Sequence, residues 1–293
     1  RDPEMSRGLG DVYKRQLMPE PKNTLLGKDT VYSDRYNPDL LQPIPRALGR
    51  DAIGDHDFRG TDIWRLYELS WLNEQGIPQT AVGELLVPAC THSIVESKSL
   101  KLYAGSFAMT KMSGKDEVAH RMAEDLSSRL GEQVEVRLYD VTAYPGAVRA
   151  MPGINLDTLT LSEGDIVNAY ETEPAYLKFD ENRSETATET FSTSVFRSLC
   201  PVTGQPDLAS ILISYTGKAI DQAGLLKYLV SYRCHRGFHE QCVEQIFHDL
   251  RAAFAPEMLE VYACFTRRGG IDINPFRSSM RDTPDAIIRE MRQ

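Results

Sequence analysis

TAVGELLVPACTHSIVESKSLKLYAGSF, residues 80–107, joins an apolar run of strand length to a segment of helical character. The run over 80–87 predicts a strand, and 97–107 predicts a helix. Apolar residues then recur every four positions over 118–130, just before a glycine, which predicts a second helix. Alternating apolar residues over 134–138 predict another strand. The order is therefore strand, helix, helix, strand.

The same order recurs in the second half of the chain. Alternation over 211–215 predicts a strand, 225–232 and 239–254 predict two helices, and 259–265 alternates again. Repetition of one unit along a chain implies two similar modules. Because a helix pair must bury its apolar faces, we expect an α+β fold in which each module lays two helices on one face of an antiparallel sheet.

These patterns divide the chain into an N-terminal module over 23–144 and a C-terminal module over 198–293. The segment 145–197 is acidic and the least periodic, so we expect a solvated connector there. Residues 1–22 are expected to be a non-native or disordered tail, because the DVYKRQ within them looks like translated sequencing adapter, with the true start at Met18.

Composition narrows the class of protein. A chain of 293 residues with 41% apolar content can bury a globular core. No apolar run reaches membrane-span length and no signal peptide is evident, which favours a cytoplasmic protein without membrane contact. The net charge of −9 disfavours direct binding of nucleic acid. An odd number of scattered cysteines favours reduced thiols over disulfides: Cys90, Cys200, Cys234, Cys242 and Cys264.

CPVTGQPD, residues 200–207, places a thiol and a carboxyl on one short segment with two prolines, which exclude helix. A thiol attacks an electrophilic carbon as the thiolate, so a group that handles its proton is needed nearby. Cys200 is the candidate nucleophile, and Asp207 is the candidate proton donor. The alternative is structural, since free cysteines usually pack as small apolar side chains and Asp after Pro commonly forms turns.

This stretch resembles the signature loop of the QueF family. These are NADPH-dependent nitrile reductases that convert 7-cyano-7-deazaguanine to its aminomethyl product during the biosynthesis of queuosine, a tRNA modification. Further blocks similar to the family lie at 60–73, 96–103, 238–244 and 266–275. The resemblance covers nearly all of 23–293, in the long two-module form. The chain departs from the family pattern at three apolar positions outside the reacting pair: Leu208, Ala209 and Phe276.

The resemblance implies tandem modules of the tunnelling fold (T-fold), whose members bind purine-like or pterin-like ligands at junctions, anchored by glutamate. It also implies a homodimer and no direct contact with tRNA. The expected reaction adds Cys200 to the nitrile as a covalent thioimide, with Asp207 as general acid. Four electrons are needed to reach the amine, so two NADPH are expected per turnover.

Family matching also supplies the expected binding residues. Glu96 and Glu240 are expected to anchor the deazaguanine edge by accepting two adjacent N–H groups. The full set expected for the substrate is Val95, Glu96, Ser97, Phe238, His239 and Glu240, and the set expected for NADPH is Ser97, Lys98, Arg268 and Gly269. No Gly-x-Gly-x-x-Gly follows a strand, so NADPH must bind differently from the Rossmann mode.

Two other functions compete with this one. A zinc hydrolase resembling the T-fold cyclohydrolases would use the thiol and imidazole cluster of Cys234, His235, His239 and Cys242, although the spacing matches neither Cys-x-x-Cys nor His-Glu-x-x-His. We therefore expect no metal. A non-catalytic purine-binding T-fold protein is the third possibility, and the pairing of Cys200 with Asp207 disfavours it.

Overall fold

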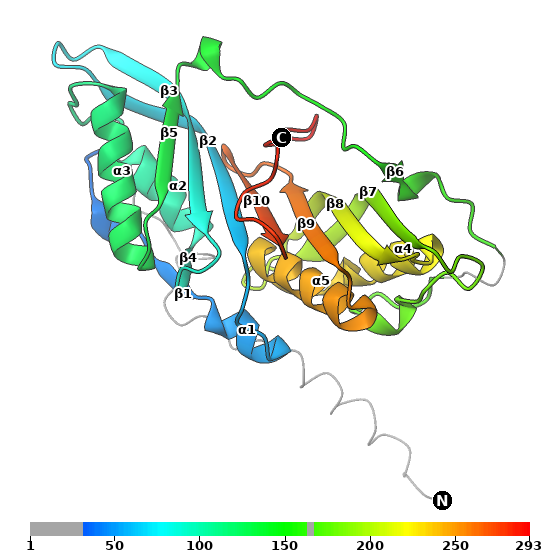
Figure 1. Cartoon of the computed structure of the whole chain (residues 1–293). Coiled ribbons are helices and arrows are strands. Elements are labelled where there is room, and N and C mark those ends of the chain that lie inside the picture. Colours follow the sequence, from blue (N-terminus) through cyan, green and yellow to red (C-terminus); the bar gives the residue numbers. More distant parts are fainter. Residues whose placement is uncertain (1–31, 163–166) are drawn as a thin grey trace, which may run out of the picture.

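A long hairpin followed by two helices makes up the first half of the fold (Figure 1). The computed structural model describes residues 32–162 and 167–293, so the whole tail predicted over 1–22, with the candidate start at Met18, lies outside the described residues. The elements are β2 (Gly60–Leu72), β3 (Pro78–Pro88), α2 (Ser97–Gly105), α3 (Lys115–Leu130) and β5 (Glu135–Tyr139).

The second half repeats this arrangement and adds a strand. Another long hairpin is followed by two helices and two final strands: β7 (Thr186–Leu199), β8 (Pro206–Lys218), α4 (Gln222–Ser231), α5 (His239–Phe254), β9 (Met258–Phe265) and β10 (Ile271–Ser278). Both hairpins carry a register shift partway along, between Leu66 and Leu69 in β2 and between Thr193 and Phe196 in β7. The two modules are thus alike in element order and in this local irregularity.

Eight strands form one continuous sheet in the order β5-β3-β2-β10-β9-β8-β7-β6, with β6 at Ile154–Asn155. The modules join where β10 pairs with β2. All neighbours are antiparallel except β6 and β7. A separate two-stranded sheet pairs β1 (Pro43–Pro45) with β4 (Ser93–Val95), and α1 (Ala47–Ile53) follows β1. Short 3₁₀ helices occur at Pro38–Leu40, Val141–Ala143, Leu156–Thr158, Pro174–Tyr176 and Tyr232–Cys234.

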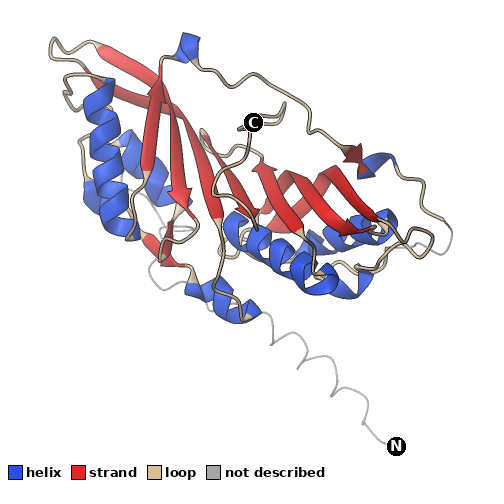
Figure 2. Cartoon of the chain, viewed as in Figure 1, coloured by secondary structure: helices blue, strands red, loops and turns tan. Residues whose placement is uncertain are grey.

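Each helix pair buries an apolar stripe against its half of the sheet (Figure 2). On α3 the buried side chains are Val118, Met122, Leu126 and Leu130, the four that predicted the helix. The opposite face of the sheet is covered near β10 by the C-terminal segment, where Ile287 and Ile288 pack on the small cluster around Tyr262 and Phe276. No helix in the described ranges is both long and apolar enough to cross a bilayer.

The α+β class and the order of strand, helix, helix, strand in each half are confirmed. The structure adds that the sheets of the two modules are continuous, because β2 and β10 pair edge to edge. The connector predicted over 145–197 contains most of β7, whose many Thr and Ser residues gave no apolar period. How the rest of the chain divides into domains stays a prediction.

Candidate active site

A cavity of about 240 Å³ lies where the two modules meet. The joining strands contribute Trp64 from β2 and Ile271 and Ile273 from β10, so the cavity is built on the junction itself. The other lining residues come from loops and helix starts in both modules: Ile94, Val95, Ser97, Lys98, Lys101, Cys200, Pro201, Thr203, Gln205, Asp207, Gly237, Phe238, His239, Glu240, Thr266, Arg268 and Gly269. All of the predicted site residues except Glu96 line it.

Cys200 lies at the turn of the β7–β8 hairpin. Its N–H donates to the carbonyl of Gln205 at 2.9 Å, and its own carbonyl accepts from the N–H of Gly204 at 3.0 Å. Gly204 has φ 68°, in the left-handed region that glycine enters without strain. The thiol is half-buried and unpaired with any other cysteine. The turn therefore fixes the Cys200 backbone while its sulfur faces the cavity residues.

The two prolines of the segment suggested that Asp207 lies in a loop. It is instead the second residue of β8 and pairs with Ser198 of β7. Its carboxylate is 5% exposed. Oδ1 lies 2.8 Å from a guanidinium nitrogen of Arg268 and 3.3 Å from Nε2 of His239. Strand pairing thus holds Asp207 beside the thiol loop, between a permanent cation and an imidazole.

His239 is the first residue of α5, and its ring stacks on Phe265 of β9 with centroids 3.8 Å apart and planes at 8°. Its buried Nδ1 has no hydrogen-bond partner within the described part of the chain. Phe238 precedes it, and its N–H donates to the side chain of Gln241 at 3.0 Å. The stacked ring is held rigidly with one nitrogen toward Asp207.

Glu240 is 2% exposed and lines the cavity from the first turn of α5. Burial, and after it the nearby charge of Asp62, raise the pKa of its carboxyl to about 8. Oε1 is buried without a hydrogen-bond partner among the described residues. A buried, unsatisfied acceptor facing a cavity is suited to a ligand that brings N–H donors.

Glu96 is placed otherwise than predicted. Its carboxylate caps α2, with one oxygen accepting from the N–H of Lys98 at 2.7 Å and the other from the N–H of Ser99 at 2.8 Å. Burial raises its pKa, although the two N–H donors act in the opposite direction. Helix capping is a local use of a carboxylate that a family motif does not reveal. Each oxygen therefore already accepts one hydrogen bond.

One rim of the cavity is basic. Lys98 and Lys101 come from α2, and Arg268 comes from the two-residue turn between β9 and β10, where Gly269 and Gly270 have φ 56° and 79°. A Cβ built on Gly269 would lie 2.8 Å from the ammonium nitrogen of Lys101, so turn and helix are in contact. Sequence reasoning missed Lys101, although it follows Lys98 by three residues, the spacing that shares a helix face. This cationic rim fits the phosphates of a dinucleotide.

The zinc alternative finds no support in the side chains that would carry it. Among the described residues no group of three His, Cys, Asp or Glu is placed to hold a metal ion. Cys234 is exposed, whereas Cys242 is buried, and burial raises the pKa of its thiol to about 12. Burial also lowers the pKa of His235 to about 4. The four side chains do not form one ligand set.

The three departures from the family pattern lie outside the cavity lining. Leu208 is 40% exposed on β8, Ala209 is buried in the C-terminal core, and Phe276 packs on the opposite face of the sheet. The pocket is therefore lined without them.

Comparisons with known proteins identify the family of this chain. The family model described as "Nitrile reductase, 7-cyano-7-deazaguanine-reductase N-term" matches residues 32–138, and that of "QueF-like protein" matches 206–284. Proteins named NADPH-dependent 7-cyano-7-deazaguanine reductase from Burkholderia mallei and Burkholderia thailandensis are each 47% identical over 277 residues, covering 93% of this chain and 99% of theirs. The apo crystal structure of the archaeosine synthase QueF-Like is 18% identical, with 32% of this chain and 92% of that one covered and a TM-score of 0.29. On the family models and the two relatives, the chain belongs to the QueF family of nitrile reductases.

Proposed function

We propose that this chain reduces the nitrile of 7-cyano-7-deazaguanine to the primary amine of 7-aminomethyl-7-deazaguanine, with NADPH as reductant, on the pathway to queuosine in tRNA. The observation that carries the proposal is one cavity lined by Cys200, Asp207 and Glu240, in a chain that belongs to the family. Each of these three residues has a separate task in this proposal.

Glu240 anchors the substrate. The deazaguanine edge presents a ring N–H beside an exocyclic amino group, and a carboxylate accepts both in bidentate fashion. Val95, Ser97 and Phe238 line the same cavity and complete the substrate contacts. Glu96 is the second anchor, and each of its oxygens already accepts one helix N–H, which leaves one lone pair on each for the ligand.

Cys200 forms the covalent intermediate. The Cys200 thiol gives its proton to Asp207, the resulting thiolate adds to the nitrile carbon, one π bond of the C≡N group opens, and Asp207 delivers the proton to the nitrogen. The product is a thioimide, which accepts hydride more readily than the nitrile. Asp207 Oδ1 lies 2.8 Å from Arg268 and 3.3 Å from Nε2 of His239, so His239 is placed to relay a proton to or from the acid.

NADPH supplies one hydride to the electrophilic carbon each time it binds. After the first hydride the C–S bond breaks, which returns the Cys200 thiolate and leaves an imine. The second hydride and a proton convert the imine to the amine, so two NADPH and two protons balance the reduction of one nitrile to a neutral amine. The stacked His239 ring and Phe238 cover the cavity beside Cys200 and limit hydrolysis of the imine.

The cofactor contacts are Ser97 and Lys98 at the start of α2 and Arg268 and Gly269 on the β9–β10 turn, with Lys101 added by the structure. Lys98, Lys101 and Arg268 neutralise phosphate, and Gly269 leaves room for it. When Arg268 binds phosphate it no longer pairs with Asp207. Cofactor binding and readiness of the acid are thereby linked in this proposal.

The function is tested by incubating purified protein with 7-cyano-7-deazaguanine and NADPH. We expect two NADPH to be oxidised for each amine formed, and an intact-mass adduct equal to the substrate when NADPH is omitted. Well-folded protein that gives neither turnover nor adduct contradicts the proposal, and binding without turnover supports the non-catalytic alternative.

Two further proposals concern the setting of the enzyme. By analogy with the family we propose a homodimer, and sedimentation at micromolar concentration should give twice the chain mass of 33.0 kDa. A monomeric mass with full activity contradicts it. We also propose a cytoplasmic enzyme, because Cys90 and Cys234 are exposed free thiols and a reducing compartment preserves them.

A further inference from the structure

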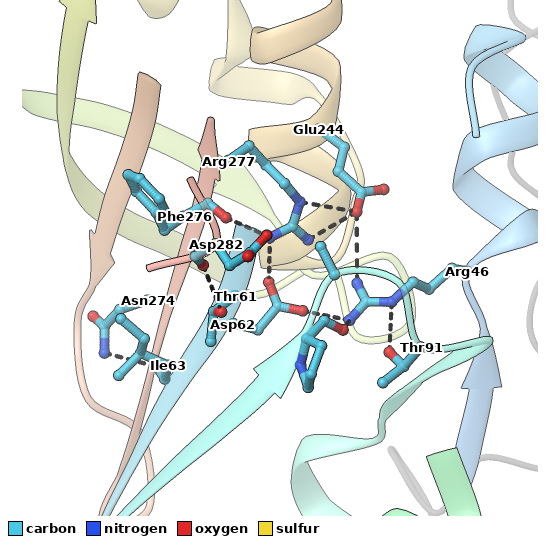
Figure 3. Close-up of polar contacts among 12 residues, drawn as sticks. Arg46, Thr61, Asp62, Ile63, Thr91, Glu244, Asn274, Phe276, Arg277 and Asp282 are labelled. Carbon is cyan, nitrogen blue, oxygen red and sulfur yellow. Dashed lines mark hydrogen bonds and ion pairs between the residues drawn. The ribbon is translucent and has the colours of Figure 1, made fainter. Parts of the chain in front are cut away.

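A buried cluster of charges joins β2, β10 and α5 (Figure 3). Asp62 of β2 sits between two guanidiniums, 2.6 Å from Arg46 and 2.7 Å from Arg277 of β10. Glu244 of α5 pairs with Arg50 at 2.7 Å and with Arg277 at 2.8 Å. Each of these side chains is less than a tenth exposed. Such a cluster is costly to bury unless its charges balance.

Glu240 belongs to this cluster by position. It precedes Glu244 by one helical turn on α5, which places the two side chains on the same face. The charges acting on its carboxyl are those of Asp62, which raises its pKa, and of Arg46 and Arg277, which lower it. In the described part of the chain, Oε1 of Glu240 is buried without a hydrogen-bond partner. Nη1 of Arg46 also has no hydrogen bond there, and its contact is an ion pair with Oε1 of Glu244 at 3.5 Å.

Counting charges shows what the cluster lacks. Three guanidiniums, those of Arg46, Arg50 and Arg277, face two ionised carboxylates, those of Asp62 and Glu244. Burial acts to raise the pKa of Asp62 and of Glu244, but the arginines hold both below their usual values. The third carboxyl is Glu240, so the described cluster is neutral only when Glu240 is ionised.

We propose that Arg46, Asp62 and Arg277 are positioning residues for Glu240, and that a ligand presenting two adjacent N–H donors drives off the Glu240 proton when it binds. This inference rests on the proposed function, since it takes Glu240 as the substrate anchor. An ionised carboxylate accepts both N–H groups, whereas a protonated carboxyl offers one acceptor and one donor. Binding therefore completes the charge balance of the cluster.

The other charged and titratable groups around Glu240 are the same in the two proteins that the test compares, so a difference between these proteins comes from Glu240. These groups are Arg50 from α1, Cys242 and His239 on α5, Lys98 and Lys101 on α2, Arg268 on the β9–β10 turn, and Asp207 on β8. The Cys200→Ala background removes covalent addition, so only non-covalent binding of 7-cyano-7-deazaguanine is observed. Glu240→Gln in that background keeps the shape of the side chain and removes its titration.

Calorimetry in two buffers of different ionisation enthalpy measures the protons released on binding. With a pKa near 8, we expect about 0.9 proton released per site at pH 7. Because only the ionised form binds, affinity should rise about fifty-fold from pH 6 to pH 8 and level off above that. In Glu240→Gln we expect weaker binding that releases no proton and does not change between pH 6 and pH 8.

Two neighbours should move this pH dependence in opposite directions, which a purely structural role does not do. Asp62→Asn removes a negative charge, so the rise in affinity should occur at lower pH. Arg46→Met removes a positive charge, so it should occur at higher pH, and Arg46→Lys should restore the native profile. Thermal melting identifies variants that fail to fold. If these variants do not fold, the number of protons that the Cys200→Ala protein releases on binding decides whether the inference holds.

The inference and the proposed function fail in different ways. Turnover of the nitrile by the unsubstituted protein, with no proton released on binding and a flat affinity from pH 6 to pH 8, overturns the inference and leaves the function standing. Shifts of the same sign in Asp62→Asn and Arg46→Met also overturn it. Absence of both binding and turnover overturns the proposed function first.

Discussion

Replacing Cys200 with alanine should reduce NADPH oxidation on 7-cyano-7-deazaguanine at least about a thousandfold, because the nitrile then has no thiol to form the thioimide. The side chain is half-buried on a turn whose backbone hydrogen bonds do not involve the sulfur. The variant should therefore fold and bind substrate, held by Glu240. The checks are the turnover number, the intact mass with substrate present, and calorimetric binding.

Cys234→Ala is the matched control. Cys234 is exposed and does not line the cavity, so this variant should retain native turnover and the mass adduct. Equal loss of activity in both variants would count against a unique nucleophile and revive the metal alternative, which uses Cys234. Full activity in Cys200→Ala would remove the covalent mechanism altogether.

Asp207→Asn should lower kcat by about 10²- to 10⁴-fold, the range that a positioned general acid contributes. The amide has nearly the same shape as the carboxyl but cannot donate an acidic proton to the nitrile nitrogen. Adduct formation in the absence of NADPH should slow by a similar factor, since the proton is needed as sulfur adds. Single-turnover mass spectrometry measures this step directly.

Two further variants distinguish the effect of losing the Asp207 acid from the effects of losing an exposed carboxyl or the neighbouring cation. Asp39→Asn alters a carboxyl whose side chain is 86% exposed and should leave kcat unchanged. Arg268→Ala removes the cation beside Asp207, so it should raise KM for NADPH by roughly tenfold through loss of a phosphate contact, with a smaller change in kcat. A loss of kcat in Arg268→Ala as large as in Asp207→Asn would contradict this division of roles.

Local patterns predicted much of the fold. The four-residue period over 118–130 predicted α3 because those side chains pack on the sheet one turn apart, and 239–254 predicted α5 to the residue. The strand β2 was not predicted, since Asp62, Arg65 and Glu68 interrupt its apolar run. Asp62 and Arg65 are nevertheless buried, because each forms an ion pair with a residue more than 200 positions later in the chain. These partners are Arg277 and Asp272.

The candidate site, like the fold, was predicted only in part from the sequence. The family motifs indicated residues that the structure brings to one cavity, including Cys200, Asp207 and Glu240. They did not reveal that Glu96 caps α2, that Arg268 pairs with Asp207, or that Lys101 completes the basic rim. These facts depend on how turns and helix ends from separate modules meet.

The sequence by itself determined the four main helices, the strands with a clear apolar pattern, the repeated module, and the residues whose chemistry suits a nitrile reductase. These depend on the side-chain period and on residue identity, which are local properties of the chain. Only the tertiary structure decided that the modules share one sheet, that the cavity lies at the β2–β10 junction, and that the charges of the buried Arg46 and Arg277 act on Glu240. The reason is physical: burial and charge pairing depend on which distant segments come into contact, and a local pattern carries no record of those contacts.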